Sequence, residues 1–189
     1  DYFGISVDMN QQGDRVIVGA HHSGITDTSH PAYNTKGMAR VYEFSNEWSQ
    51  FGGDFIGELA NDQFGKSVSI NAAGDRISIG SPYNDAPLKN NASSSATHTS
   101  SGMVRVFEYR TASQSEWDSY NTTDQKSSTG FPIILSNGDS ALDNSKKYWV
   151  QLEDDIHGES ANSQLGSSID MDCDGKTMAV GSIGKNEAE

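Results

Sequence analysis

The sequence predicts an all-β protein made of repeated four-stranded antiparallel units, and three observations support this fold class. An ungapped segment occurs three times, at residues 3–20, 64–81 and 165–182. Within each copy apolar and polar residues alternate, as in strands with one buried face. No stretch places apolar residues at helical spacing, so helix should be scarce. A four-stranded unit of about 60 residues is typical of β-propeller blades.

The repeat has a recognisable frame of glycines. Each copy begins with an aromatic residue or Leu followed by Gly, and a second Gly occurs near the end of the copy. Chance agreement at this level is remote, so these positions should be structural. They are Phe3, Gly4, Gly19, Phe64, Gly65, Gly80, Leu165, Gly166 and Gly181.

The first two strands of each unit form a hairpin. Val7 and Met9 alternate with polar residues, and the later copies repeat this pattern. The Gly-Asp or Asp-Gly pair that follows is typical of a turn requiring positive φ. The predicted second strands cover 15–20, 76–81 and 177–182.

Two more repeated blocks supply the third and fourth strands. Residues 37–44 match 102–109, which predicts strands at 40–44 and 105–109. A block that begins at Trp48 recurs with every spacing preserved from Trp149, which predicts strands at 48–51 and 149–152. Because both tryptophans recur with the frame, we expect them to be structural and to pack between units.

The repeats divide the chain into three parts. Residues 1–63 form a first unit that starts within the repeat, 64–164 a second, and 165–189 the start of a third. The second unit is longer because inserts fall at about 84–101 and 110–147. About two and a half units are therefore covered, and we expect them to be part of a larger propeller.

Composition narrows the class of partner. The 189 residues carry a net charge of −13, which argues against nucleic acid because that partner requires a basic face. No apolar run is long enough to span a membrane. The single cysteine, Cys173, cannot form a disulfide within the chain.

The Phe-Gly…Val-Gly-Ala and Phe-Gly…Ile-Gly-Ser frames resemble FG-GAP repeats, the blades of the integrin α-like β-propeller family. The resemblance covers nearly all of the chain outside the inserts. It implies a propeller fold at a cell surface, with binding through loops. It also implies a calcium loop in the hairpin between the two glycines.

The third hairpin is the candidate for that calcium loop. Its carboxylates alternate and end in Gly, a pattern that suits the hard oxygen ligands of Ca²⁺. The resemblance assigns Asp170, Asp172 and Asp174 as ligands, although Met178 stands where the family loop has a further acid. The alternative is a polar hairpin turn without metal.

Two other groups of residues are candidates for a catalytic site or a metal site. The repeated acids Asp54, Glu58, Asp155 and Glu159 resemble a carboxylate pair, but their repetition favours a role in forming the unit over catalysis. His21, His22 and His30 lie near one another and could hold zinc, yet other copies have no matching His. A solvated loop is the favoured interpretation.

The inserts contain two N-glycosylation sequons, at Asn91 and Asn121. Loops on a rigid scaffold commonly carry recognition. The sequence therefore predicts a non-enzymatic extracellular or cell-surface recognition and adhesion scaffold, with a protein or glycan ligand. The alternatives are a structural subunit of an extracellular filament, built from further copies of the chain, and, less favoured, a propeller hydrolase.

Overall fold

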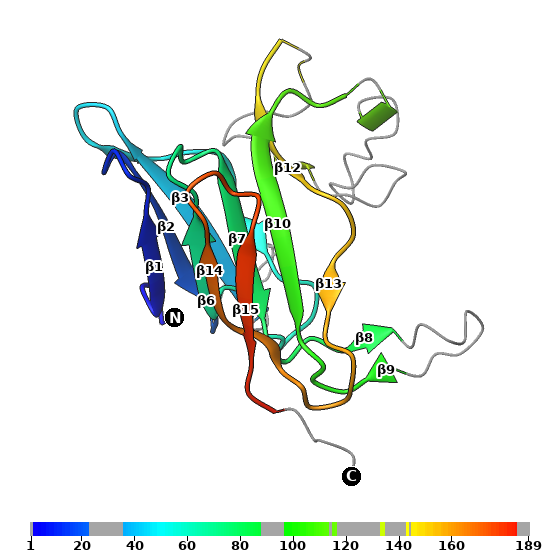
Figure 1. Ribbon diagram of the computed structural model, residues 1–189. Coiled ribbons are helices and arrows are strands. Elements are labelled where there is room, and N and C mark those ends of the chain that lie inside the picture. The colour runs from blue at the N-terminus through cyan, green and yellow to red at the C-terminus, as the bar shows by residue number, and fades with distance from the viewer. Residues whose placement is uncertain are drawn as a thin grey trace.

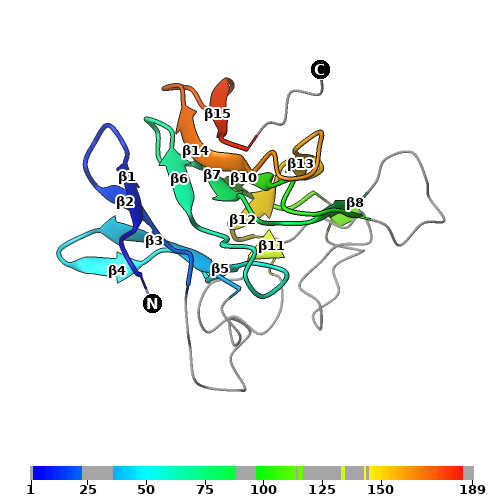
Figure 2. The same ribbon diagram turned by 90° about the horizontal axis from the view of Figure 1, so that it is seen from below.

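The computed structural model describes residues 2–22, 36–87, 97–113, 115–116, 133–134, 143 and 145–184. The predicted all-β class is confirmed, because every element with described bounds is a strand and every pair of strands is antiparallel. The strands form three main sheets that fan out side by side, with β1, β6 and β14 next to one another (Figure 2). Within the described part of the chain, no sheet closes on itself.

The first sheet follows the order predicted for one unit. Its strands pair in the sequence β1-β2-β3-β4, and β5 pairs with the start of β3. The strands are β1 (Ser6–Met9), β2 (Arg15–Ala20), β3 (Met38–Phe44), β4 (Trp48–Gln50) and β5 (Phe55–Ile56). The third strand begins two residues earlier than predicted, and β5 is an additional strand.

The second sheet repeats this order and extends it. Its strands pair as β6-β7-β10-β12-β11, and β13 pairs with β10 as β5 does with β3. Its strands are β6 (Ser67–Ile70), β7 (Arg76–Ser81), β10 (Met103–Arg110), β11 (Ile133–Ile134), β12 (Tyr148–Gln151) and β13 (Ile156–His157). Buried Ile133 and Ile134 show that part of the long insert joins the sheet as a fifth strand beside β12.

The third sheet is the hairpin of β14 (Leu165–Met171) and β15 (Met178–Ser182), which packs across β6 and β7 (Figure 1). A separate small hairpin, β8 (Ala86–Pro87) and β9 (Thr97–His98), lies within the first insert. In the described residues, no helix is long and apolar enough to cross a membrane.

The predicted hairpin glycines have the conformation that the turns require. Gly13, Gly74 and Gly175 have φ angles of 73°, 73° and 69°. The glycines of the Phe-Gly frame are also left-handed, with φ of 91° at Gly4 and 85° at Gly65. Glycine adopts this region without the steric cost that a Cβ brings, which explains why the frame recurs.

The main core lies between the first and second sheets. Fully buried aromatic residues from both sheets meet there, with Phe55 4.9 Å from Phe107 and 5.9 Å from Trp149 between ring centroids. Trp149 also donates its indole N–H to the carbonyl oxygen of Phe51 in the preceding unit. It therefore packs between units as predicted, whereas Trp48 is half exposed and stacks only on Phe44 among the ring contacts of the described residues.

Candidate functional site

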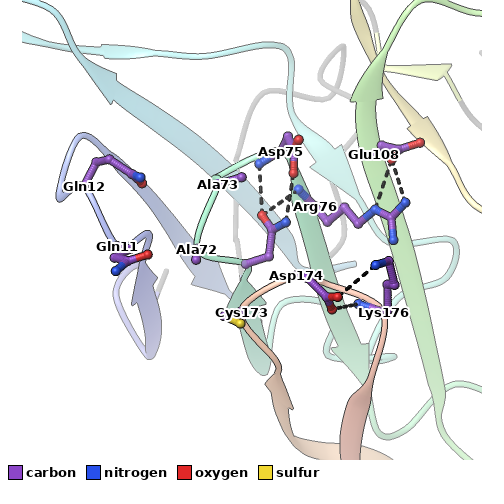
Figure 3. Close-up of a pocket in the computed structure, with 11 residues that line it drawn as sticks. Gln11, Gln12, Ala72, Ala73, Asp75, Arg76, Glu108, Cys173, Asp174 and Lys176 are labelled. Atoms are coloured by element: carbon purple, nitrogen blue, oxygen red, sulfur yellow. Dashed lines mark hydrogen bonds and ion pairs between the residues drawn. The ribbon is translucent and has the colours of Figure 1, made fainter.

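The turns of the hairpins β1–β2, β6–β7 and β14–β15 lie side by side and border a shallow cavity of about 500 Å³ (Figure 3). Backbone hydrogen bonds join the turns. The Gln11 amide donates to the Ala72 carbonyl oxygen at 3.2 Å, and the Ala72 amide donates to the Cys173 carbonyl oxygen at 3.1 Å. Because equivalent positions are linked in series, one surface is built from all three units.

An Asx cap fixes each turn in the same way. In the first unit, Asn10 Oδ1 accepts the backbone amides of Asp14 and Arg15, at 3.1 and 2.9 Å. Asn71 makes the same two bonds in the second unit, both at 3.0 Å, to Asp75 and Arg76. Such side-chain acceptors satisfy donors that the tight turn leaves without a strand partner.

In the third unit, Asp172 takes the place of these asparagines. Its Oδ1 accepts the amides of Lys176 and Thr177 at 2.9 and 3.0 Å. Asp174 Oδ2 pairs with Lys176 Nζ at 2.9 Å, and this bond lowers the pKa of the Asp174 carboxyl. Of the three predicted calcium ligands, Asp172 therefore accepts hydrogen bonds from the turn, and Asp174 forms an ion pair with Lys176.

Asp170, the third predicted calcium ligand, lies on β14 and is exposed. In the described residues, no group of three His, Cys, Asp or Glu side chains lies close enough to hold a metal ion. Calcium binding at Asp170, Asp172 and Asp174 stays a prediction. The turn alternative has specific hydrogen bonds to support it.

Arginine residues connect neighbouring hairpins below the turns. Arg15 binds Glu43 through Nε at 2.9 Å and Nη2 at 2.6 Å, and donates Nη1 to the Gly74 carbonyl oxygen of the next unit at 3.0 Å. Arg76 repeats the arrangement with Glu108 and Gly175. Sequence reasoning missed this contact, although Gly-Asp-Arg occurs in both copies.

The cavity is lined by polar and small apolar side chains, and Arg76 and Lys176 are paired with Glu108 and Asp174. Gln11 and Gln12 border it on the first hairpin, Ala72 and Ala73 form its middle, and Lys176 borders it on the third (Figure 3). Amide groups and paired charges beside small methyl groups suit a polar ligand that offers both donors and acceptors. The Cys173 thiol is free and exposed at the same surface.

The repeated acids outside the hairpins hold arginines. Asp54 accepts two hydrogen bonds from Arg40, at 2.7 and 2.8 Å, and Asp155 binds Arg105 in the same bidentate way. Glu58 binds Arg105 from the preceding unit at 2.9 Å. Gln50 and Gln151 also donate to Asp54 and Asp155, each at 2.7 Å. These contacts support a role of the three acids in forming the unit, whereas Glu159 is exposed.

Buried Arg105 and partly buried Asp155 form an ion pair in which two influences on the pKa of Asp155 oppose each other. Burial is the largest influence on Asp155 and would raise its pKa, but the hydrogen bonds and charge of Arg105 outweigh it, so the pKa of Asp155 is lowered. Both groups therefore remain charged at neutral pH. A carboxylate held in this way is a poor proton donor for acid–base chemistry.

The remaining predicted positions fall in several places. The sequons at Asn91 and Asn121 lie outside the described residues, as does His30. His21 is buried, 6% exposed, which corrects the solvated-loop interpretation for that residue. Its ring packs at a tilt against Tyr2 and edge to face with His22, with centroids 5.1 and 4.5 Å apart.

Comparison with known proteins adds no assignment. No protein-family model matches the sequence, and a search of curated proteins finds no match.

Proposed function

We propose that this chain is a non-enzymatic recognition scaffold, built from propeller blades of the FG-GAP type and working outside the cell or at its surface. The observation that carries the proposal is the cavity that the three hairpin turns share. Binding surfaces assembled from several repeats are characteristic of proteins in which a rigid repeated framework positions short loops.

The organisation of the polar side chains supports binding over catalysis. Where arginines and acids recur between units, they hold one another and the backbone, as in Arg15–Glu43 and Arg40–Asp54. The cavity offers paired charges and amides in a fixed arrangement. The ligand class that fits such a surface is a polar one, an extended peptide or a glycan.

A binding screen tests this proposal. The immobilised chain would be exposed to a glycan array and to a panel of purified extracellular-matrix proteins, and any binder would be titrated by biolayer interferometry. Ala73→Arg places a long side chain at the exposed middle of the cavity and should weaken binding at least about tenfold.

Ala60→Arg is the matched control because it makes the same change at an exposed position near Asp62, beyond the opposite end of β7. It should leave binding unchanged. A confirmed ligand whose affinity is the same for both variants and the wild type would place recognition away from the hairpin turns and contradict the proposal.

A further inference from the structure

The first unit exposes apolar side chains that are buried at equivalent positions in the second. Phe64, Val68 and Ile70 are 0%, 7% and 5% exposed, because the first sheet packs against them. Their counterparts in the first unit are Phe3, Val7 and Met9, which are 51%, 62% and 52% exposed. We call this exposed surface of Phe3, Val7 and Met9 the plug face, because the equivalent surface of the second unit packs against the first unit.

At each internal interface, a serine and a glycine of one unit contact the carbonyl oxygen of a glycine in the next unit, and we call this pair the socket. Ser6 donates its hydroxyl to the Gly65 carbonyl oxygen at 2.9 Å, and Ser67 donates to the Gly166 carbonyl oxygen at 2.7 Å. The facing glycines, Gly19 and Gly80, lie so close to these carbonyl groups that a Cβ would overlap with them.

The third unit has the same socket without a described neighbour on it. Ser168 and Gly181 occupy the equivalent positions, and the three atoms nearest to a Cβ on Gly181 would all belong to Ser168. Ala179, the counterpart of fully buried Ile17 and Ser78, is exposed. We call the surface of Ser168, Ala179 and Gly181 the socket face.

The plug face and the socket face lie at opposite ends of the fan of sheets, with β1 at one end and β14–β15 at the other (Figure 2). Gly4, the plug residue equivalent to Gly65 and Gly166, would meet nothing within 4 Å if it carried a Cβ. The same kind of interface joins the first unit to the second and the second to the third. The plug face and the socket face correspond to its two sides.

We propose that the socket face binds a further unit of this repeat, and that a second copy of the chain supplies it head to tail through its plug face. Repetition of the internal contacts would bring the Ser168 hydroxyl to the Gly4 carbonyl oxygen of the second copy. It would also bring the Cys173 amide to that copy's Gln11 carbonyl oxygen. Apolar burial of the plug face supplies the main driving force. The proposal stands independently of the hairpin-tip ligand.

One contact opposes this association in the wild-type chain. At the first internal interface, Asp8 Oδ2 accepts a hydrogen bond from Ser69 Oγ at 2.9 Å. At the second, Ser69 Oγ accepts the Met171 amide at 3.2 Å, and Asp170 follows at the equivalent position of the third unit. A second copy would bring its Asp8 against Asp170, and like charges juxtaposed at an interface weaken binding.

Asp170→Ser removes this opposition and recreates the residue that the second unit presents to the third. Because Asp170 is exposed, the change should leave the monomer fold intact. Sedimentation equilibrium of the full chain should show concentration-dependent association, with a Kd at least about tenfold lower for Asp170→Ser than for the wild type.

A complementation experiment distinguishes head-to-tail docking from other association. In the Asp170→Ser background, Val7→Arg blocks the plug face and Ala179→Arg blocks the socket face; both positions are exposed. Each variant alone should sediment as a 20.4 kDa monomer. Their mixture should give a complex of one copy of each, because each retains the half that the other lacks.

Ala73→Arg in the same background is the control, since Ala73 lies on the middle unit between the two end faces. It should associate as strongly as Asp170→Ser, and circular dichroism melts establish that all variants are folded. A mixture that stays monomeric would overturn the proposal. So would association of the Ala179→Arg variant alone with the Kd of its parent.

Discussion

Ser67 donates its side-chain hydroxyl to the carbonyl oxygen of Gly166 at 2.7 Å, across 99 positions of sequence. The bond is buried and joins the second unit to the third. The same bond from Ser6 to Gly65 joins the first unit to the second. The repeated sequence thus forms the same interface twice, so a substitution at one position can be compared with the same substitution at its equivalent in another unit.

Ser67→Ala should destabilise the protein by about 1–3 kcal/mol, because the buried Gly166 carbonyl group loses its partner. Ser168→Ala makes the same change where the structure shows an exposed hydroxyl, and should cost less than about 0.5 kcal/mol. Urea unfolding of the two variants measures both values. Equal losses would contradict the assignment of the cost to the interface.

Gly80→Ala should be more damaging than Gly181→Ala. The Cβ at residue 80 would overlap with the backbone carbonyl of Gly166, which cannot move without separating two units, whereas at residue 181 it meets the side chain of Ser168. We expect Gly80→Ala to cost at least about 2–3 kcal/mol and Gly181→Ala about 1 kcal/mol or less. Thermal melts that rank the variants in the opposite order would contradict the role of residue 80 as a contact point.

The sequence was sufficient to predict the repeated hairpins and the strands that follow them in the first two units, but not the short strands β5 and β13. Alternation placed the strand 15–20 at its observed bounds, and the Gly-Asp pairs located the turns, because both signals depend on neighbouring residues. It did not reveal that Arg15 reaches the Gly74 carbonyl group, since that contact depends on how two sheets are juxtaposed. It also gave no indication that Ile133 and Ile134 add a strand to the second sheet.

The candidate site was predicted only in part, for the same reason. The third hairpin was singled out by its carboxylates, but its place beside two other hairpins follows from the packing of units. The burial of His21 could not be predicted from composition, because it depends on the β1–β2 hairpin that brings Tyr2 beside the His21 ring. Repetition identified Asp155 as structural, while its partner Arg105, 50 positions away, required the sheet register.

Arg105→Ala should cost about 2–3 kcal/mol, because it leaves the partly buried Asp155 carboxylate, 17% exposed, without its cation. Arg40→Ala removes the equivalent pair with Asp54, but the Arg40 side chain is 29% exposed against 5% for Arg105. Water can replace part of that interaction, so the loss should be about 1 kcal/mol. Guanidinium chloride unfolding of both variants makes the comparison, and a smaller loss at Arg105 would show that its pair contributes little.

Protonation of His21 should destabilise the fold as the pH falls. Burial, together with the charges of Lys66 and His22, lowers the pKa of His21 from 6.5 to about 4. The unfolded chain therefore binds a proton that the folded chain does not, and stability is lost between about pH 6.5 and 4, by up to roughly 3 kcal/mol.

His21→Gln should flatten this part of the stability profile. Urea unfolding at pH 7, 5.5 and 4.5 would be compared for the variant and the wild type, so that contributions from other titrating groups cancel. Parallel profiles for the two proteins would show that His21 does not titrate on unfolding.

Asp172→Asn tests whether the third hairpin is a turn or a metal loop. Asn10 and Asn71 form the same pair of amide bonds through an uncharged Oδ1, so in EDTA the variant should match the wild type within about 0.5 kcal/mol. If the hairpin is a turn without metal, in which Asp172 and Asp174 hold the turn amides and Lys176, added calcium should leave the melting temperature of both proteins unchanged. A calcium-dependent rise in the wild type that Asp172→Asn abolishes would instead establish Asp172 as a ligand, since a metal that binds only the folded state stabilises it by mass action.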